Sequence, residues 1–334
     1  MFYLEEIKSK LAFDNTLNKQ NRFTCGQFLQ SFAWSKFNKK LDQKTIKIIV
    51  RKKANGKEKN VAKALVITKK VKKILRFGYC PYGPVWDKNL TQKEIQTVFK
   101  LIEKHLKKSK LHFFRFNPPV EKDKSLNIDK LKLSKSKTKQ PQKTLFLKLN
   151  QSYDNLLAQM KSKTRYNIRL AQRKKLQVKK GISQKSINDF LTLSRITSER
   201  DNFKSWSSNY YKTLIKTLQE YKMIQIYTAY YKKKAIASNI VVFFNDTATY
   251  LHGASSNEQR NLMPTYALQW AAIQDAKKNK CKYYDFWGIN SQKWPGVTRF
   301  KVGFGGQKIE FHPAYEIPLN KKIYFLYSLT RLFF

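Results

Sequence analysis

The sequence predicts a mixed α+β protein built from two domains. The chain has 334 residues, 41% of them hydrophobic and 14% aromatic, which is enough to bury two cores of ordinary size. Short segments rich in β-branched and aromatic residues are interspersed with segments whose apolar residues recur at helical spacing. This succession occurs twice, so the order of elements suggests a duplicated fold, although the sequence itself contains no visible repeat.

In the first half, the strands of one sheet are expected at residues 44–50, 61–68, 71–79 and 111–116. A helix is expected at residues 91–108, because Thr91 and Glu94 have the spacing of a capping box ahead of regularly spaced apolar residues. Residues 121–143 contain eight lysines and few large apolar side chains. We therefore expect a solvated connector there, and a domain boundary near residue 145.

The second half follows the same plan. Strands are expected at residues 144–149, 223–230, 236–244, 247–253 and 282–287. Helices are expected at residues 152–175, 184–200 and 208–220, from Pro264 onward, and in the tail from Leu319. Proline suits the first turn of a helix, because its missing N–H would have no partner there.

The chain is strongly basic. It carries 68 basic and 22 acidic residues, a net charge of +46, which attracts nucleic acid or anionic lipid. However, 56 of the basic residues are lysine, the bias that an AT-rich genome produces at exposed positions, so both explanations stay open. No groove-entering motif is present, so any nucleic acid is expected to be held through its backbone.

Several classes of protein are excluded. Cys25, Cys80 and Cys281 and the four histidines lack the short spacings of disulfide-rich or zinc-binding proteins, so no metal site is expected. Every window of eighteen residues contains a charge, and the first ten residues lack an apolar segment. Neither a transmembrane helix nor a secretory signal is therefore expected, and we expect the protein in the cytoplasm.

Residues 296–306, GVTRFKVGFGG, join a glycine-rich turn to two cations. Arg299 and Lys301 are expected to alternate along an extended segment. An ammonium group aimed at a developing tetrahedral oxygen stabilises it. Lys301 is also one of 56 lysines, so a plain surface position remains the alternative.

Residues 250–264 predict a strand that ends in a polar loop leading to a helix N-terminus, where free N–H groups favour an anion. Gcn5-related acetyltransferases have a glycine-rich turn at such a place, which wraps the pyrophosphate of coenzyme A. No glycine occurs between Gly253 and the helix, which argues against that cofactor. His252 is expected to be structural, because no nucleophilic serine or cysteine motif accompanies it.

Three arginines occupy one face of an expected helix. Arg165, Arg169 and Arg173 are spaced by four residues each, in a chain with only twelve arginines. They form either a solvated surface or a set of forked phosphate contacts.

Several segments together resemble the FemABX family of aminoacyltransferases, which form peptidoglycan bridges with amino acids from aminoacyl-tRNA. They are TRYNIRLAQRKKL (164–176), SERDNF with NYY (198–211), YLHGASSNEQRNLMPTYALQWAAI (250–273), YYDFWGI (283–289), GVTRFKVGFGG (296–306) and, more loosely, QSFAW and PYGP near the front. The resemblance covers nearly the whole chain, and it implies a role in cell-wall biogenesis.

The resemblance implies two domains with the fold of Gcn5-related acetyltransferases, in the compact form without the helical arm of some members. The C-terminal helix of this family returns to the first domain. The domains would therefore be residues 1–145, completed by a helix at about 317–334, and residues 146–316. A monomer is expected.

The implied reaction is attack by a side-chain amine of the stem peptide on the ester carbonyl of aminoacyl-tRNA. No metal or coenzyme would be needed, because the ester is already activated. By motif position, Lys301 would stabilise the oxyanion with Arg299 beside it, and Lys36 would hold the phosphates of the UDP-linked or lipid-linked precursor. The other implied substrate-binding residues are Tyr210, Asn239, Tyr250 and Arg260, and the implied tRNA-binding residues are Arg165, Arg169 and Arg173.

The sequence departs from the family pattern just before the paired tyrosines Tyr210 and Tyr211. Family members often have an arginine there, whereas this sequence has Ser205, Trp206 and Ser207. Lys204 or Arg200 would have to substitute for it. An N-acyltransferase that uses acyl-CoA and a non-catalytic RNA-binding protein are the alternatives from other classes.

The basic, aromatic tail has two open roles. It is expected to pack on the first domain through Ile323, Leu326 and Leu329, or to contact the inner membrane leaflet. Both roles can hold together if these three residues face inward while Phe333 and Phe334, beyond the last helical turn, stay free.

Overall fold

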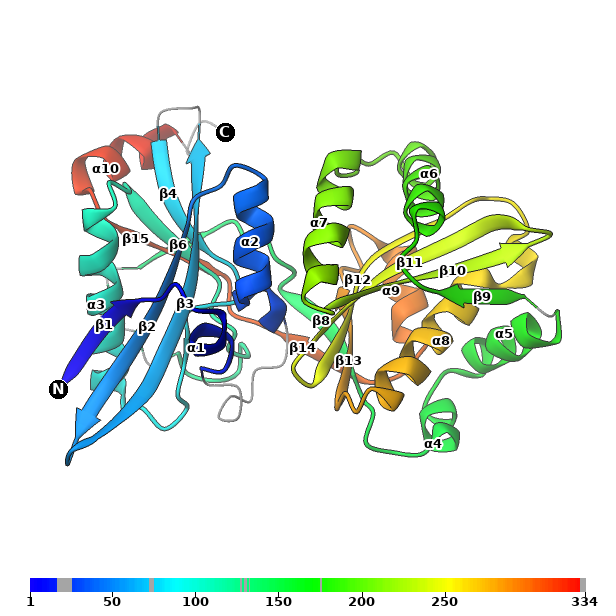
Figure 1. Ribbon diagram of the computed structural model, residues 1–334, viewed down its shortest axis with the longest axis horizontal. Helices are drawn as coiled ribbons and strands as arrows, with labels where there is room; N and C mark the ends of the chain where they lie inside the picture. The colour runs from blue at the N-terminus through cyan, green and yellow to red at the C-terminus, as the bar shows by residue number, and fades with distance from the viewer. Residues whose placement is uncertain are drawn as a thin grey trace. The chain divides into compact units, whose positions relative to one another are not determined.

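The computed structural model describes residues 1–16, 26–71, 75–126, 128, 131, 133–174 and 176–330. The chain divides into two compact units (Figure 1). Unit 1 comprises Met1–Gln142 and Glu310–Phe334, and unit 2 comprises Lys143–Ile309. We propose that these units are the two domains. Cys25, Phe333 and Phe334 lie outside the described residues.

Unit 1 is built on a mixed sheet. Its described strands have the order β1-β2-β3-β4-β6-β15-β7, and β5 pairs with β3. They are β1 (Phe2–Glu6), β2 (Thr45–Ala54), β3 (Lys57–Val71), β4 (Leu75–Cys80), β5 (Val85–Trp86), β6 (Phe113–Phe116), β7 (Ser134–Ser136) and β15 (Ala314–Pro318). The β2–β3 hairpin turns at Asn55 and Gly56, whose φ angles of 49° and 73° are those that an Asn-Gly turn adopts readily.

Helices cover both faces of this sheet (Figure 1). They are α1 (Lys10–Asp14), the 3-10 helix η1 (Gln27–Gln30), α2 (Phe32–Lys40), α3 (Gln92–Lys108) and α10 (Lys321–Thr330). The expected capping box of α3 is confirmed, because the Glu94 backbone N–H donates to the Thr91 hydroxyl and the Thr91 backbone N–H donates to the Glu94 carboxylate. The apolar stripe of α3 forms the core with alternate residues of β2 and β3.

The expected solvated connector at residues 121–143 is wrong in part. Leu126 and Ile128 are 6% and 1% exposed and belong to the core that contains the buried face of α3. β7 pairs with β15 at the edge of the sheet. The many lysines conceal this role, because a few isolated apolar side chains are sufficient to close a core.

A buried ionic network attaches β15 and α10 to the N-terminal part of unit 1. Glu316 is fully buried, and its carboxylate accepts hydrogen bonds from Arg115 Nε at 2.7 Å and from the Tyr324 hydroxyl at 2.8 Å. Removing one partner of such a pair costs about 3–5 kcal/mol, because the other charge is left buried. The return of the C-terminal segment to the first sheet therefore depends on Arg115 and Glu316, which are 201 positions apart.

The inward face of α10 differs from the expected one. Tyr324 and Tyr327 pack against Phe113. Leu326 and Leu329 are 64% and 40% exposed, so the expectation that they face inward is wrong. Aromatic side chains whose hydroxyl groups reach Glu316 and Arg115 occupy the inner side instead.

Unit 2 repeats the strand order of unit 1. Read in the direction that matches β1 to β7, its sheet has the order β9-β10-β11-β12-β13-β8-β14. The strands are β8 (Lys143–Lys148), β9 (Gln177–Lys180), β10 (Ile224–Tyr231), β11 (Lys234–Phe244), β12 (Thr247–Ser255), β13 (Tyr283–Gly288) and β14 (Gln307–Glu310). In each unit three antiparallel strands lead through a helix, α3 or α8, to a parallel strand, β6 or β13.

The helices of unit 2 also lie on both faces of its sheet. They are α4 (Tyr153–Ala158), α5 (Ser162–Arg173), α6 (Gln184–Arg200), α7 (Ser208–Glu220), the 3-10 helix η2 (Arg260–Leu262), α8 (Pro264–Lys278) and α9 (Pro295–Val302). α8 covers one face, and α6 and α7 cover the other (Figure 1). The single helix expected at residues 152–175 is two helices, because the extended Lys161 interrupts it and donates its backbone N–H to Gly303 O.

Two further features follow from the lengths of the helices. The longest in the described part of the chain, α3 and α6, have 17 residues each, and neither forms a long arm. None of the helices in that part is both long and apolar enough to cross a membrane.

Candidate functional site

The parallel strands of unit 2 separate at their carboxyl ends. β12 and β13 pair at three positions, the last being Thr249 with Asp285, although both strands continue beyond it. In unit 1 the matching strands β4 and β6 remain paired to Cys80 and Phe116, where both end. The carboxyl ends of parallel strands are the usual place for a binding site in open sheets. The two strands of unit 2 therefore diverge where those of unit 1 remain paired, and we refer to this divergence of the backbone as the opening.

Lys301 is buried at this opening. Its side chain comes from α9, and its Nζ donates to Gly288 O, at the end of β13, at 2.8 Å. On the β12 side, Nζ lies 5.4 Å from the centre of the Tyr250 ring. The ammonium group therefore lies between the end of β13 and the part of β12 just beyond the last paired position.

The extended segment expected around Lys301 is wrong, because these residues form α9. The helix begins at Pro295, where proline is favoured, and it ends before a run of glycines. Gly305 and Gly306 have φ angles of 79° and 93°, which glycine adopts without strain. The glycines that suggested a flexible turn are the signal that ends the helix.

Burial changes the acid–base behaviour of Lys301. Removal from water lowers its pKa to about 8, and the negative charge of Asp285 opposes that change. The ammonium form therefore predominates at neutral pH, which an oxyanion-stabilising role requires.

Arg299 does not accompany Lys301 into the opening. Two residues apart on an α-helix are separated by about 200° around its axis. Accordingly Lys301 is buried while Arg299 is exposed. A direct role beside Lys301 stays a prediction, and the geometry places Arg299 on the outer side of α9.

Tyr250 and Asn239 meet at Gly253. A Cβ atom at position 253 would lie 1.8 Å from the Tyr250 hydroxyl, so only glycine leaves room for that ring. Asn239 is the cross-strand partner of Gly253, and its Nδ2 has no hydrogen-bond partner in the described part of the chain. Burial raises the pKa of Tyr250 to about 12, so its hydroxyl remains protonated.

Two buried polar residues in this part of unit 2 were not predicted from the sequence. Asp285 and Gln269 are both fully buried. Gln269 accepts a hydrogen bond from the Tyr284 hydroxyl at 2.8 Å, whereas its Nε2 has no partner among the described residues. The available signal was a single acidic residue within the aromatic strand YYDFW.

Tyr210 lies on the other side of the sheet. A register shift pairs Tyr250 with Val241 and His252 with Ile240, so Tyr250 and His252 point to opposite faces. Tyr210 and Tyr211 pack edge-on against His252. Burial lowers the pKa of His252 to about 4, so this ring stays neutral.

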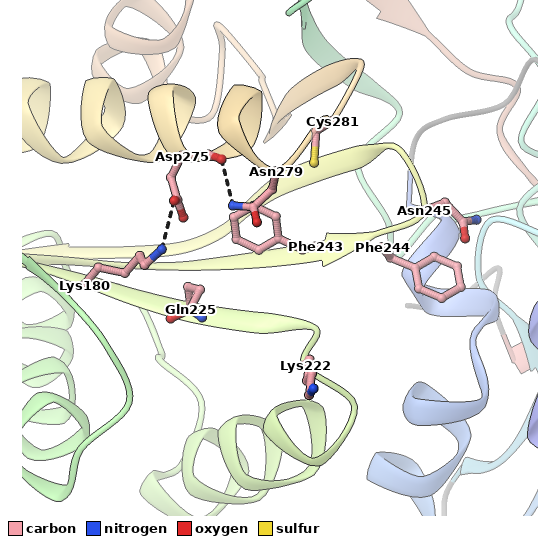
Figure 2. A pocket seen from close by; sticks show the side chains of 9 residues that line it. All are labelled: Lys180, Lys222, Gln225, Phe243, Phe244, Asn245, Asp275, Asn279 and Cys281. Carbon is pink, nitrogen blue, oxygen red and sulfur yellow. Dashed lines mark hydrogen bonds and ion pairs between the residues drawn. The ribbon is translucent and has the colours of Figure 1, made fainter.

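A pocket of about 190 Å³ lies elsewhere in unit 2 (Figure 2). It is lined in part by Asn245, just before β12, and by Cys281, just before β13. Because these strands are parallel, their starts lie at the opposite edge of the sheet from Lys301. Lys180 crosses the pocket to form an ion pair with Asp275, at 2.9 Å, so its cation is already neutralised. We do not place the chemistry there.

Comparison with known proteins identifies the family. The FemAB family profile matches residues 12–138, 129–232 and 219–331. The chain belongs to the FemAB family. The expectation drawn from the motifs is therefore confirmed.

One curated relative matches the chain along most of its length, and another matches about a quarter of it. It is 20% identical to the lipid II:glycine glycyltransferase of Staphylococcus epidermidis, and the match covers 90% of each chain. It is 30% identical to the aminoacyltransferase FemA of Staphylococcus aureus over 87 residues, which are 25% of this chain and 21% of that protein.

Solved structures confirm the fold class. The crystal structure of FemX matches with a TM-score of 0.84 and 19% identity, covering 96% of this chain and 99% of that one. A tandem GNAT protein from the clavulanic acid pathway matches with a TM-score of 0.54 and 9% identity, covering 96% and 99%. The two units of this FemAB protein therefore have the expected tandem acetyltransferase-like fold.

The three arginines of α5 divide into two kinds. Arg165 donates to the backbone oxygens of Ala158 and Met160, so its guanidinium stabilises the break between α4 and α5. Arg169 and Arg173 are exposed, and Arg173 lies 5.9 Å from the centre of the exposed Tyr166 ring. Only the latter two present their cations to solvent.

The structure separates the two candidates for the missing FemAB arginine. The Arg200 guanidinium binds the Asp201 carboxylate at 2.7 Å and Ser255 O at 2.9 Å. Lys204 is exposed. Arg260, in η2, is exposed as well. Lys204 is therefore the better candidate.

Lys36 belongs to unit 1 and is exposed on α2. Its Nζ lies 5.5 Å from the centre of the Phe32 ring, and Lys47 approaches the same ring at 5.4 Å. Lys47 is buried, and its pKa is lowered by burial and by the neighbouring charges of Lys39 and Lys36. Lys36 thus stands at the edge of a group of cations.

Proposed function

We propose that this protein is an aminoacyltransferase that adds an amino acid to a side-chain amine of a peptidoglycan stem peptide and so builds interpeptide bridges. Membership of the FemAB family supports acyl transfer. The relatives named lipid II:glycine glycyltransferase and aminoacyltransferase FemA support a peptidoglycan precursor as the acceptor. The observation that carries the proposal is the buried ammonium group of Lys301 at the opening between β12 and β13.

The reaction divides into addition and collapse. The acceptor nitrogen attacks the ester carbonyl carbon of the donor, which forms a C–N bond and a tetrahedral oxyanion. One N–H of the Lys301 ammonium group donates to Gly288 O, and the other two are available to donate to that oxyanion. Collapse breaks the C–O bond, and the proton lost by the amine ends on the leaving hydroxyl. One such donor in a site shielded from water is worth about 2.7–4 kcal/mol.

Aminoacyl-tRNA is the proposed donor. The exposed cations of Arg169 and Arg173 on α5 suit a phosphate backbone, and the exposed Tyr166 ring suits base stacking. The net charge of +46 strengthens this attraction. An acyl-CoA donor is less well supported, because Pro264 removes an N–H group from the start of α8 and no glycine lies between Gly253 and this helix.

Labelled donors test the proposal. The protein is incubated with a muropeptide precursor and with either labelled aminoacyl-tRNA or labelled acetyl-CoA. We expect label in the precursor only from aminoacyl-tRNA. Label from acetyl-CoA would indicate an N-acyltransferase, and tRNA binding without any product would indicate an RNA-binding protein.

Lys36→Ala is expected to raise the Michaelis constant for the precursor by about tenfold with little change in turnover. One charge-assisted contact to a phosphate is worth about 1.5–3 kcal/mol, and its loss also weakens the dependence on salt. Steady-state kinetics at two salt concentrations measure both effects. Lys40→Ala, at the exposed end of the same helix, is the control. An unchanged constant in Lys36→Ala removes this lysine from the site.

A lipid-linked precursor would bring the protein to the inner membrane leaflet, and α10 has a suitable surface. Phe325 and Leu326 are 62% and 64% exposed, next to the exposed Lys321 and Lys322. Exposed apolar side chains beside lysines favour an anionic membrane interface, where each lysine contributes about 1 kcal/mol.

We therefore expect weak, salt-sensitive binding to vesicles that contain anionic lipid, and weaker binding by Leu326→Ser. Co-sedimentation with the vesicles measures it. Leu11→Ser is the matched control, because Leu11 is a 71% exposed leucine on α1. Equal binding by the two variants would show that α10 does not contact the membrane.

A further inference from the structure

Asp285 is a fully buried carboxylate in the strand that ends at the proposed site. It accepts a hydrogen bond from the Thr144 hydroxyl of β8 at 2.5 Å and another from the Trp287 backbone N–H at 2.8 Å. Burying a carboxylate is costly unless it has such partners. Neither of these two hydrogen-bond donors is a cation.

The two hydrogen bonds hold an irregular end of β13. The pairing of β13 with β8 shifts register between Asp285 and Gly288, and Trp287 has a φ angle of 62°, which is unfavourable for a bulky residue. The Thr144 hydroxyl also lies 3.0 Å from Trp287 O. Asp285 and Thr144 thus clamp the bulge, one through the N–H of Trp287 and the other through its C=O.

The clamp determines where Gly288 presents its carbonyl group. Gly288 is the residue after the strained Trp287, and its carbonyl oxygen is the hydrogen-bond acceptor of Lys301 Nζ. If the bulge relaxed, this oxygen would move and the ammonium group would lose its anchor. A displacement of about 1 Å in a catalytic group can cost about a hundredfold in rate.

The charges of Asp285 and Lys301 also interact. Asp285 on β13 acts on Lys301 through its charge, the Tyr250 ring on β12 lies beside the ammonium group, and Tyr284 on β13 interacts with both of these residues. Tyr250 is neutral, and Arg299 on the same helix is exposed. Asp285 therefore supplies the negative charge that favours the ammonium form of Lys301.

We propose that Asp285, held by Thr144, is a positioning residue for acyl transfer: it fixes the Gly288 carbonyl that anchors Lys301 and supplies the charge that keeps Lys301 cationic. This inference rests on the proposed function of Lys301. It adds two residues, from β8 and β13, that do not touch the substrates.

Asp285→Asn tests the charge, because it keeps the shape of the side chain. We expect turnover to fall about tenfold to a hundredfold with nearly unchanged Michaelis constants. Activity that needs the ammonium form is present below the pKa of Lys301, about 8, and is lost above it. Removing the negative charge lowers that pKa further, so the alkaline limb of the pH–rate profile moves to lower pH in Asp285→Asn. An unmoved limb overturns the charge role.

Thr144→Val tests the clamp. If Asp285→Asn does not fold, Thr144→Val alone tests the positioning role. It keeps the charge and the shape but removes the hydroxyl. We expect a lower turnover with an alkaline limb that moves much less, and recovery in Thr144→Ser, which retains the hydroxyl. Full turnover in Thr144→Val overturns the positioning role.

The inference and the proposed function fail in different ways. If the wild-type protein transfers no aminoacyl group, or Lys301→Met is fully active, the proposed function of Lys301 is wrong. If Lys301 is required but the variants at positions 285 and 144 behave as wild type, only the positioning role is wrong.

Discussion

Lys301→Met is expected to lower the turnover number by about a hundredfold or more. Loss of one charge-assisted donor to the oxyanion removes about 2.7–4 kcal/mol of transition-state stabilisation. Methionine fills nearly the same volume, so the side chain can remain in its buried place between β12 and β13. Single-turnover measurements with saturating substrates separate the chemical step from binding, and we expect the loss in the chemical step.

A second lysine provides the control for burial. Lys69 in β3 is partly buried and, like Lys301, has its pKa lowered by burial to about 8. Lys69→Met is expected to keep full turnover, whereas circular dichroism and thermal unfolding should show that both variants are folded. Near-normal turnover in a folded Lys301→Met protein would contradict the assigned role.

Gly253→Ala is expected to lower turnover by about thirtyfold although it adds a single methyl group. The new Cβ would lie 1.8 Å from the Tyr250 hydroxyl and 2.7 Å from the ring carbon that bears it, so the whole ring must move. Tyr250 packs its ring against the Lys301 cation, and such a contact in a shielded site is worth about 2 kcal/mol. Each 1.36 kcal/mol corresponds to tenfold in rate.

Gly296→Ala is the matched control, because a Cβ at position 296 would have no neighbour within 4 Å. It lies in the first turn of α9, where alanine is favourable. If Gly253→Ala kept full activity, the Tyr250 ring would have no part in supporting Lys301.

Local signals predicted much of the fold. The capping box of Thr91 and Glu94 marked the start of α3, and proline marked the start of α8. These signals involve residues close in sequence, so their physical effect is visible without the structure. The motifs identified the family for a different reason, since they match its pattern rather than reveal a contact.

The missed elements depend on partners far away in the chain. β7 is a strand because β15 lies beside it, and nothing in the lysine-rich residues 121–143 indicates that partner. Glycines near residue 303 predicted a turn and concealed α9, since a helix-ending glycine looks the same as a flexible one. Local pattern cannot separate these cases.

The candidate site shows the same limit. The motif match pointed to Lys301, but its burial and its bond to Gly288 follow from packing that spacing does not indicate. Asp285 was missed because its partner Thr144 is 141 positions away. The roles of Lys301, Lys36, Tyr250 and the arginines stay predictions until the variants are measured.

The return of β15 and α10 to unit 1 has a consequence for synthesis on the ribosome. Unit 2 is one continuous stretch, Lys143–Ile309, and its sheet can close as soon as that stretch has emerged. The first part of unit 1 emerges earlier, but its sheet is incomplete until Glu316 has been synthesised. Without Glu316, Arg115 is a buried cation with no counter-charge from β15. The part of the chain that is made first is therefore completed last, and the nascent protein carries an open first sheet while its second unit already folds.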